Sequence, residues 1–195
     1  MLSRMLMLVF GFIAVAHGTS VTNISEVLNT GERTWIYSTT WNKSKCVSYI
    51  KYDIQCLHGF CYYYYNYFRK GCKKSAPVRI AEIQQKCLVT GYRDKPCVVT
   101  RKSSPYYKEV DSKVLMHWDD NIGCGVYKVL PAPSRPKATR DPSELQKCEL
   151  HVRDKALRHR RNNTLDLKPC EEALKKECGE NHTSLTNYSC MCPNE

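Results

Sequence analysis

The fold class of this chain is decided by an alternating segment, Trp35-Ile36-Tyr37-Ser38-Thr39-Thr40-Trp41. Successive side chains of an extended strand point to opposite faces, so the residues at positions 35, 37, 39 and 41 share one face. The opposite face then carries mostly small polar side chains. This period of two predicts a β-strand over residues 35–41.

The same alternation recurs along the chain and predicts eight further strands. They cover residues 46–54, 60–68, 78–83, 87–90, 97–101, 113–118, 125–130 and 148–153. Turn-like stretches such as 91–96 separate them at the spacing of an up-and-down antiparallel sheet. This succession favours an all-β fold with a meandering barrel, while a β-sandwich gives a similar alternation.

Two segments depart from the strand pattern. Residues 130–142 hold four prolines among basic residues, and they predict an exposed loop because proline has no N–H donor. Residues 168–179 have proline in the first turn and glycine at the end, which predicts a short helix. Cys170, Leu174 and Cys178 recur every four residues on this helix, so they should face the protein.

The N-terminus predicts secretion. Arg4 precedes an apolar run over 5–16, and Ala16-His17-Gly18 has the small-x-small pattern of a cleavage site, so residues 1–18 are interpreted as a signal peptide. The run is too short to span a bilayer, which takes about 20 residues. The expected mature protein is a single domain over residues 19–195, secreted and without a membrane span.

Composition narrows the class further. The chain has 195 residues, 12 cysteines and a formal net charge of +11, which suits one folded domain better than two. An even cysteine count in an oxidising compartment predicts disulfides, and the spacings lack the paired pattern of a zinc site. Cys87 and Cys97 flank a turn and could bridge across it. Five N-x-S/T sequons predict surface glycans, at Asn23, Asn42, Asn162, Asn181 and Asn187.

Three motifs carry a resemblance to a known family. The run K-V-L-M-H-W-D-D-N-I-G-C at 113–124 is followed by G-V-Y-K-V-L at 125–130 and C-E-L-H-V-R at 148–153. Together with residues 35–46, this order resembles the tick salivary lipocalins, the histamine-binding family. The likeness covers most of the mature chain, but residues 56–104 match only in strand character.

The resemblance implies an eight-stranded antiparallel lipocalin barrel with a C-terminal helix packed on its outside. It also implies disulfides that staple this fold. Carried onto this sequence, they join Cys46 to Cys190 or Cys192, and Cys124 to Cys170.

The resemblance further implies a ligand cavity. Glu149 and Trp41 stand at positions that resemble those of amine binders, with Tyr37 on the same strand face as Trp41, and His151 replaces an aromatic residue of the motif. Lys113 falls where amine binders place a carboxylate, which favours an anionic mediator such as a leukotriene or thromboxane. Simple alternation offers another interpretation, with Glu149 and His151 in solvent and Lys113 reaching the surface.

The tyrosines at 62–65 and 67 fall on both faces of one strand, so half of them could line a cavity. No nucleophile or metal motif accompanies the histidines, so we expect neither an enzyme nor a cofactor or metal site.

The leading hypothesis is a monomeric salivary lipocalin that sequesters histamine, another biogenic amine or an eicosanoid and suppresses host defence. The alternatives are a module that binds a host protein such as a complement component, and one that binds heparan sulfate through the basic cluster 153–161. Nucleic acid is not an expected partner.

Overall fold

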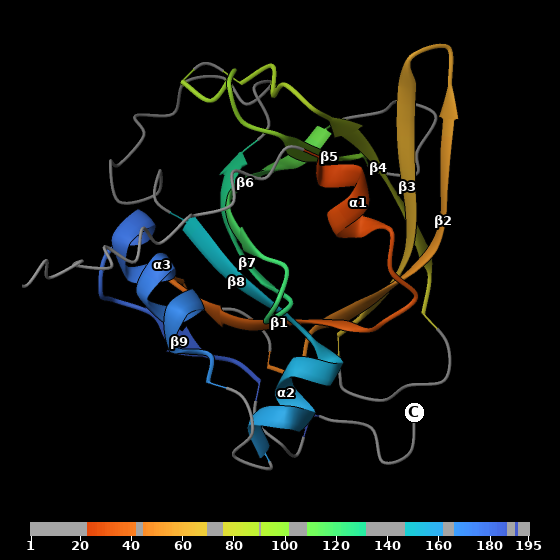
Figure 1. Cartoon of the computed structure of the whole chain (residues 1–195). Coiled ribbons are helices and arrows are strands. Elements are labelled where there is room, and N and C mark those ends of the chain that lie inside the picture. Colours follow the sequence, from red (N-terminus) through yellow and green to blue (C-terminus); the bar gives the residue numbers. More distant parts are fainter. Residues whose placement is uncertain are drawn as a thin grey trace, which may run out of the picture.

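The computed structural model describes residues 23–41, 45–69, 76–89, 91–101, 109–131, 147–161, 166–186 and Cys190. Eight antiparallel strands follow one another around a closed barrel (Figure 1), which confirms the predicted fold. Their bounds are β1 (Thr34–Thr39), β2 (Ser48–Leu57), β3 (Phe60–Phe68), β4 (Val78–Gln84), β5 (Cys97–Arg101), β6 (Glu109–Asp119), β7 (Cys124–Pro131) and β8 (Lys147–Arg153). A short strand, β9 (Thr183–Ser184), pairs with β1 outside the barrel.

The barrel closes where β1 meets β2. In the described part of the chain, this seam has two residue pairs, Thr34 with Tyr49 and Trp35 with Ser48. Beyond it, β2 continues with β3 as a hairpin that projects past the rest of the barrel (Figure 1). Its turn, His58–Gly59, has positive φ at both residues, as the tight two-residue hairpin turn requires.

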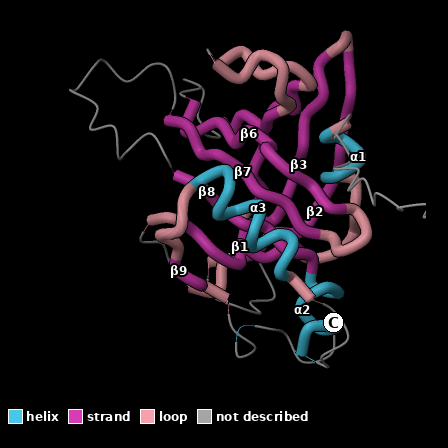
Figure 2. Tube along the Cα trace, turned by 60° about the vertical axis from the view of Figure 1, so that its left-hand side comes forward, coloured by secondary structure: helices cyan, strands magenta, loops and turns pink. Residues whose placement is uncertain are grey.

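Three helices complete the described fold. The helix α1 (Ile24–Leu28) packs its apolar side chains among the residues inside the barrel and closes one end of it. The helix α2 (Asp154–Arg161) follows β8 directly, and α3 (Lys168–Cys178) lies across β7 and β8 on the outside (Figure 2). The predicted C-terminal helix is therefore confirmed, with Pro169 in its first turn and Gly179 after its end.

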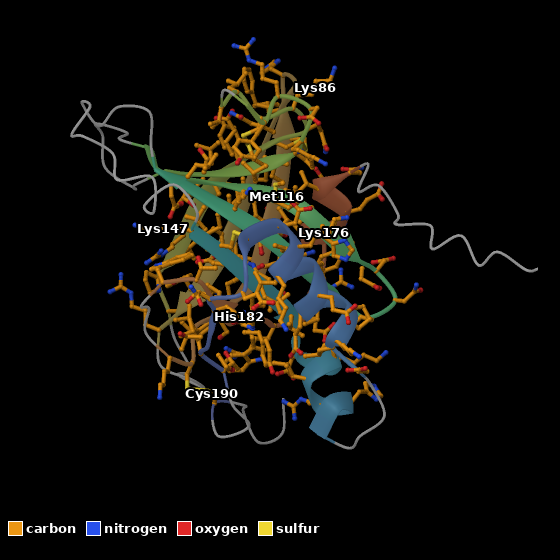
Figure 3. The ribbon with its side chains drawn as sticks, turned by 90° about the vertical axis from the view of Figure 1, so that its left-hand side faces the viewer. Lys86, Met116, Lys147, Lys176, His182 and Cys190 are labelled. Carbon is orange, nitrogen blue, oxygen red and sulfur yellow. A yellow bond between two sulfur atoms is a disulfide. The ribbon has the colours of Figure 1, made fainter. Side chains whose placement is uncertain are left out.

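Two hydrophobic layers explain why the wall under α3 is buried on both sides. The outer layer packs Trp35, Leu150 and Val152 against Leu174 of α3, and the inner layer fills the barrel with tyrosines and aliphatic side chains. Met116 of β6 contacts the outer layer and also a third cluster, beneath residues 87–92 (Figure 3). Burial of these apolar surfaces is the main force that holds the helices on the barrel.

Several sequence predictions of the fold are wrong in detail. Of the predicted strand 87–90, residues 87–89 are described and form a loop, because Cys87 bonds through its N–H to the carbonyl of Lys95 and through sulfur to Cys97. Thr90 lies outside the described residues. The strand over 35–41 ends at Thr39, and its alternation is broken by a register shift between Ile36 and Ser38.

Other predicted bounds shift as well. The strand over 46–54 begins only at Ser48, after Cys46 with its positive φ, and it continues to Leu57. The predicted loop over 130–142 starts inside β7, and residues 132–142 lie outside the described part of the chain. The helices α1 and α2 and the strand β9 were not predicted.

Disulfides tie the helix and the C-terminal segment to the barrel. Cys46 pairs with Cys190 and Cys124 with Cys170, as the resemblance implies, and Cys87 pairs with Cys97 across its loop. The remaining described bridges are Cys56–Cys61 and Cys148–Cys178. Cys72 and Cys192 lie outside the described residues.

Among the predicted glycan sites, Asn181 is exposed, whereas Asn23 is half-buried and caps α1 through its side-chain oxygen. Asn42, Asn162 and Asn187 lie outside the described residues. No described helix is long and apolar enough to cross a membrane.

Candidate functional site

The interior of the barrel contains a charged group at its centre, supplied by β8. Leu150 and Val152 point outward under the helices, so alternation along the strand turns Glu149 and His151 inward. Both faces of this strand are buried, and Glu149 is 0% exposed. The interpretation that placed Glu149 and His151 in solvent is therefore wrong, because it assumed that one face of the strand is exposed to solvent.

Glu149 forms the centre of a polar network. Its Oε2 accepts from Lys113 Nζ of β6 at 2.7 Å and lies 2.7 Å from His151 Nε2. The other ring nitrogen, Nδ1, is 2.9 Å from the hydroxyl of Tyr49. These distances fit a neutral histidine that donates from Nε2 to Glu149 and accepts the Tyr49 proton at Nδ1. Two sequence-predicted site residues, Lys113 and His151, thus meet on a third, Glu149.

The cavity beside this network is small and mostly aromatic. Its volume is about 30 Å³, room for about two water molecules. The rings of Tyr63 and Tyr65 stack at 5.0 Å, and the ring of Tyr127 lies 4.4 Å from that of His151. The lining residues are Leu28, Tyr49, Tyr63, Tyr65, Tyr67, Val98, Thr100, Lys113, Tyr127 and His151.

Charge in the cavity is carried by Lys113 rather than by Glu149. The lysine lines the cavity and its side chain keeps 18% exposure, whereas Glu149 is fully buried and does not line it. The interpretation in which Lys113 reaches the protein surface does not fit this position inside the barrel. Tyrosine hydroxyls and Thr100 add further hydrogen-bond donors to the lining.

Two more charged groups stand near Lys113 and the tyrosines. Asp111 lies two residues before Lys113 on the same face of β6, and its buried Oδ1 has no hydrogen-bond partner. The guanidinium of Arg79 lies 3.9 Å from the centre of the Tyr67 ring, in a cation–π contact. Burial lowers the pKa of Lys113, but Glu149 and Asp111 raise it by more, so this pKa lies above its ordinary value.

The other predicted ligand residues lie elsewhere. Tyr37 packs against the outer layer beside Trp35, and Trp41 follows the end of β1. Neither lines the cavity. Sequence reasoning assigned no role to Tyr49 or Tyr127, although it anticipated that alternate tyrosines of residues 62–67 could line a cavity. Tyr63, Tyr65 and Tyr67 do so.

No protein-family model matches this chain, and no curated protein matches it. Among the described residues, no group of three His, Cys, Asp or Glu side chains could hold a metal ion.

The buried tyrosines predict a loss of stability at alkaline pH. Burial raises the pKa of Tyr49, Tyr63 and Tyr127 above the ordinary value of 10.0. Above that pH the unfolded chain ionises first, so the free energy of unfolding should fall as pH rises. The raised pKa of Lys113 acts in the same direction above 10.5.

Urea unfolding at a series of pH values from about 8 to 11 measures this effect, with tyrosinate absorbance followed in parallel. Burial of the rings would be contradicted if all tyrosines of the folded protein ionised near pH 10, as seen by tyrosinate absorbance, and the protein lost no stability there.

Proposed function

We propose that this protein is a secreted lipocalin, similar to the tick salivary histamine-binding family, that sequesters a small host inflammatory mediator and so suppresses host defence. It would act by stoichiometric binding inside the barrel. The barrel fold and its disulfides support this proposal, because the eight-stranded barrel is a size that can hold one small ligand.

The position of Lys113 is the observation that supports our choice of mediator class. Its ammonium lines the cavity, while the carboxylate that neutralises it is buried behind. A cationic amine entering the cavity would meet this ammonium, whereas a carboxylate could accept from one of its remaining N–H donors. We therefore favour an acidic eicosanoid, such as a leukotriene or thromboxane, over histamine or another biogenic amine.

An eicosanoid is much larger than the cavity, which holds about two water molecules. Binding one inside the barrel therefore requires the aromatic side chains of the lining to move. Tyr63 and Tyr65 form a stacked pair, and Tyr49 meets the edge of Tyr65. Such ring pairs are each worth about 0.5–1.5 kcal/mol beyond their burial, an amount that ligand contacts can replace.

Calorimetric titration of the disulfide-intact protein with a leukotriene, a thromboxane analogue, histamine and serotonin tests the proposal. We expect heat from at least one of the acidic ligands. The variant Lys113→Met should weaken that binding about 10- to 100-fold, as expected for the loss of a charge-assisted hydrogen bond. The matched control, Lys128→Met, changes a lysine that stacks on Tyr92 outside the cavity and should leave the affinity unchanged.

Lys113→Met also leaves Glu149 without its cation, so the double variant Lys113→Met/Glu149→Gln provides an interior without this ion pair for comparison. Binding of an acidic ligand should be weakened to a similar extent in both. Absence of binding to all four compounds would overturn the sequestering function. Amine binding that persists in Lys113→Met, with no response to the acidic ligands, would overturn the choice of mediator.

A second candidate is a protein-binding module, and the projecting hairpin favours it. Leu57 and Phe60 flank its turn with 67% and 56% of their surface exposed, which is unusual for large apolar side chains on a rigid, disulfide-bridged tip. A folded protein that gives no heat with any of the four mediators would point to this function, with a host protein such as a complement component as the partner.

A further inference from the structure

A second cavity lies outside the barrel, where α2 begins. It is a cleft of about 330 Å³, some ten times the volume of the cavity inside. The turn between β6 and β7, the segment before β1 and the first turns of α2 form its walls. The lining residues are Glu32, Asp120, Asn121, Ile122, Gly123, Arg153, Lys155, Ala156 and His159.

The cleft has uncommitted positive charge. Lys155 is exposed, and its ammonium has no ion-pair or hydrogen-bond partner among the described residues. Arg153 donates from Nη2 to the carbonyl of Val27 and stacks over Trp118, but its buried Nε–H has no acceptor. A buried donor without a partner is costly, so an acceptor brought by a ligand would be favoured here.

The two carboxylates of the cleft are already engaged. Glu32 accepts the backbone N–H of Lys155 through Oε1, and Asp120 accepts from the indole N–H of Trp118 through Oδ1 at 3.3 Å. Each keeps one further oxygen that can accept a hydrogen bond, and Asn121 offers an exposed amide. The lining therefore combines the ammonium of Lys155 and one unsatisfied donor of Arg153 with acceptors for hydroxyl groups.

The size and chemistry of this lining fit one class of ligand. A simple inorganic anion would fill only a small part of 330 Å³, and the chain of a fatty acid would lie against charged side chains such as Glu32 and Lys155. Among the described lining residues the only ring is the imidazole of His159, so the cleft offers little surface on which a nucleotide base could stack. A saccharide bearing sulfate groups presents both the anions and the hydroxyls that these walls can bind.

We propose that this cleft binds a sulfated saccharide unit of the kind found in glycosaminoglycans. Lys155 and Arg153 would hold the sulfate, and Asp120 and Asn121 would bind hydroxyl groups. His159 lies on the same helix one turn after Lys155 and extends the site along α2. The net charge of +11 would draw such a polyanion toward the protein.

Calorimetry of the full mature protein with a fully sulfated heparin disaccharide, and with its desulfated form, tests the proposal. Only the sulfated form should bind. Lys155→Ala should weaken binding about tenfold, the loss of roughly one charge-assisted contact. Asn121→Trp should abolish it by filling the cleft without changing its charge. The matched control is Lys176→Ala, which changes an exposed lysine on α3 that does not line the cleft (Figure 3).

Three outcomes would overturn the site. They are no binding, equal binding of the desulfated disaccharide, and an Asn121→Trp variant that binds as tightly as the original protein. A loss in Lys176→Ala as large as that in Lys155→Ala would show diffuse attraction to a basic surface instead. Because Asn121 lies outside the barrel, titration of Asn121→Trp with a barrel mediator reports on the interior independently.

Discussion

Opening the disulfide between Cys46 and Cys190 is expected to lower the free energy of unfolding by about 5 kcal/mol. The two cysteines are 144 residues apart, and a bridge that closes so long a loop removes much of the entropy of the unfolded chain. Cys46 stands two residues before β2, and Cys190 is buried near the C-terminus. Urea unfolding of the double variant Cys46→Ala/Cys190→Ala measures the loss.

The bridge between Cys56 and Cys61 is the matched control, since its cysteines are only five residues apart. The same entropy relation gives about 2 kcal/mol for Cys56→Ala/Cys61→Ala. Equal losses for the two double variants would show that loop length does not govern their effects, and that native contacts of the sulfurs do.

Replacing Glu149 with glutamine should cost about 3 kcal/mol, the second large effect. The change keeps the shape of the side chain but leaves the Lys113 ammonium in the barrel without its counter-charge. We place the expected loss at the lower end for a broken buried pair because Lys113 retains some exposure. The hydrogen bond from His151 to Glu149 weakens at the same time.

The double variant Lys113→Met/Glu149→Gln should regain most of this stability, because it removes both charges together. As a matched control, Glu172→Gln breaks an exposed pair with Lys168 on α3 and should change stability by at most about 0.5 kcal/mol. A Glu149→Gln protein as stable as its control would mean that the interior ion pair has no role in folding, and a double variant less stable than Glu149→Gln would mean that the pair is strongly favourable.

The sequence predicts the strands of this barrel well because alternation is a local property, but it does not predict which layer covers each face. β8 shows the difference. Its Leu150 and Val152 look like the core-facing side of an ordinary half-buried strand, yet they lie under the helices while Glu149 and His151 face inward. Only the packing of α3 and α2, which is set by distant disulfides and contacts, determines this.

The sequence predicts only part of the candidate site, because the site also depends on contacts between distant segments. Lys113 and Glu149 are 36 residues apart and meet because β6, β7 and β8 are neighbours in register, a non-local fact. Tyr37 was placed with the ligand residues because it shares a predicted strand face with Trp41, but in the structure Tyr37 lies with Trp35 in the outer layer, so this face does not line the cavity. The segment 87–90 has strand-like composition, but its disulfide and its bond to Lys95 outweigh that preference.

The short seam between β1 and β2 is the weakest strand pairing of the barrel wall. Along the described strands, every other neighbouring pair in the barrel has a longer register, so parting these two strands breaks the fewest inter-strand hydrogen bonds. Tyr49, which bonds His151 inside the barrel, stands on this seam. A break in the wall at this seam would therefore lie beside the polar network, and the longer registers of the other strands would hold the rest of the barrel together.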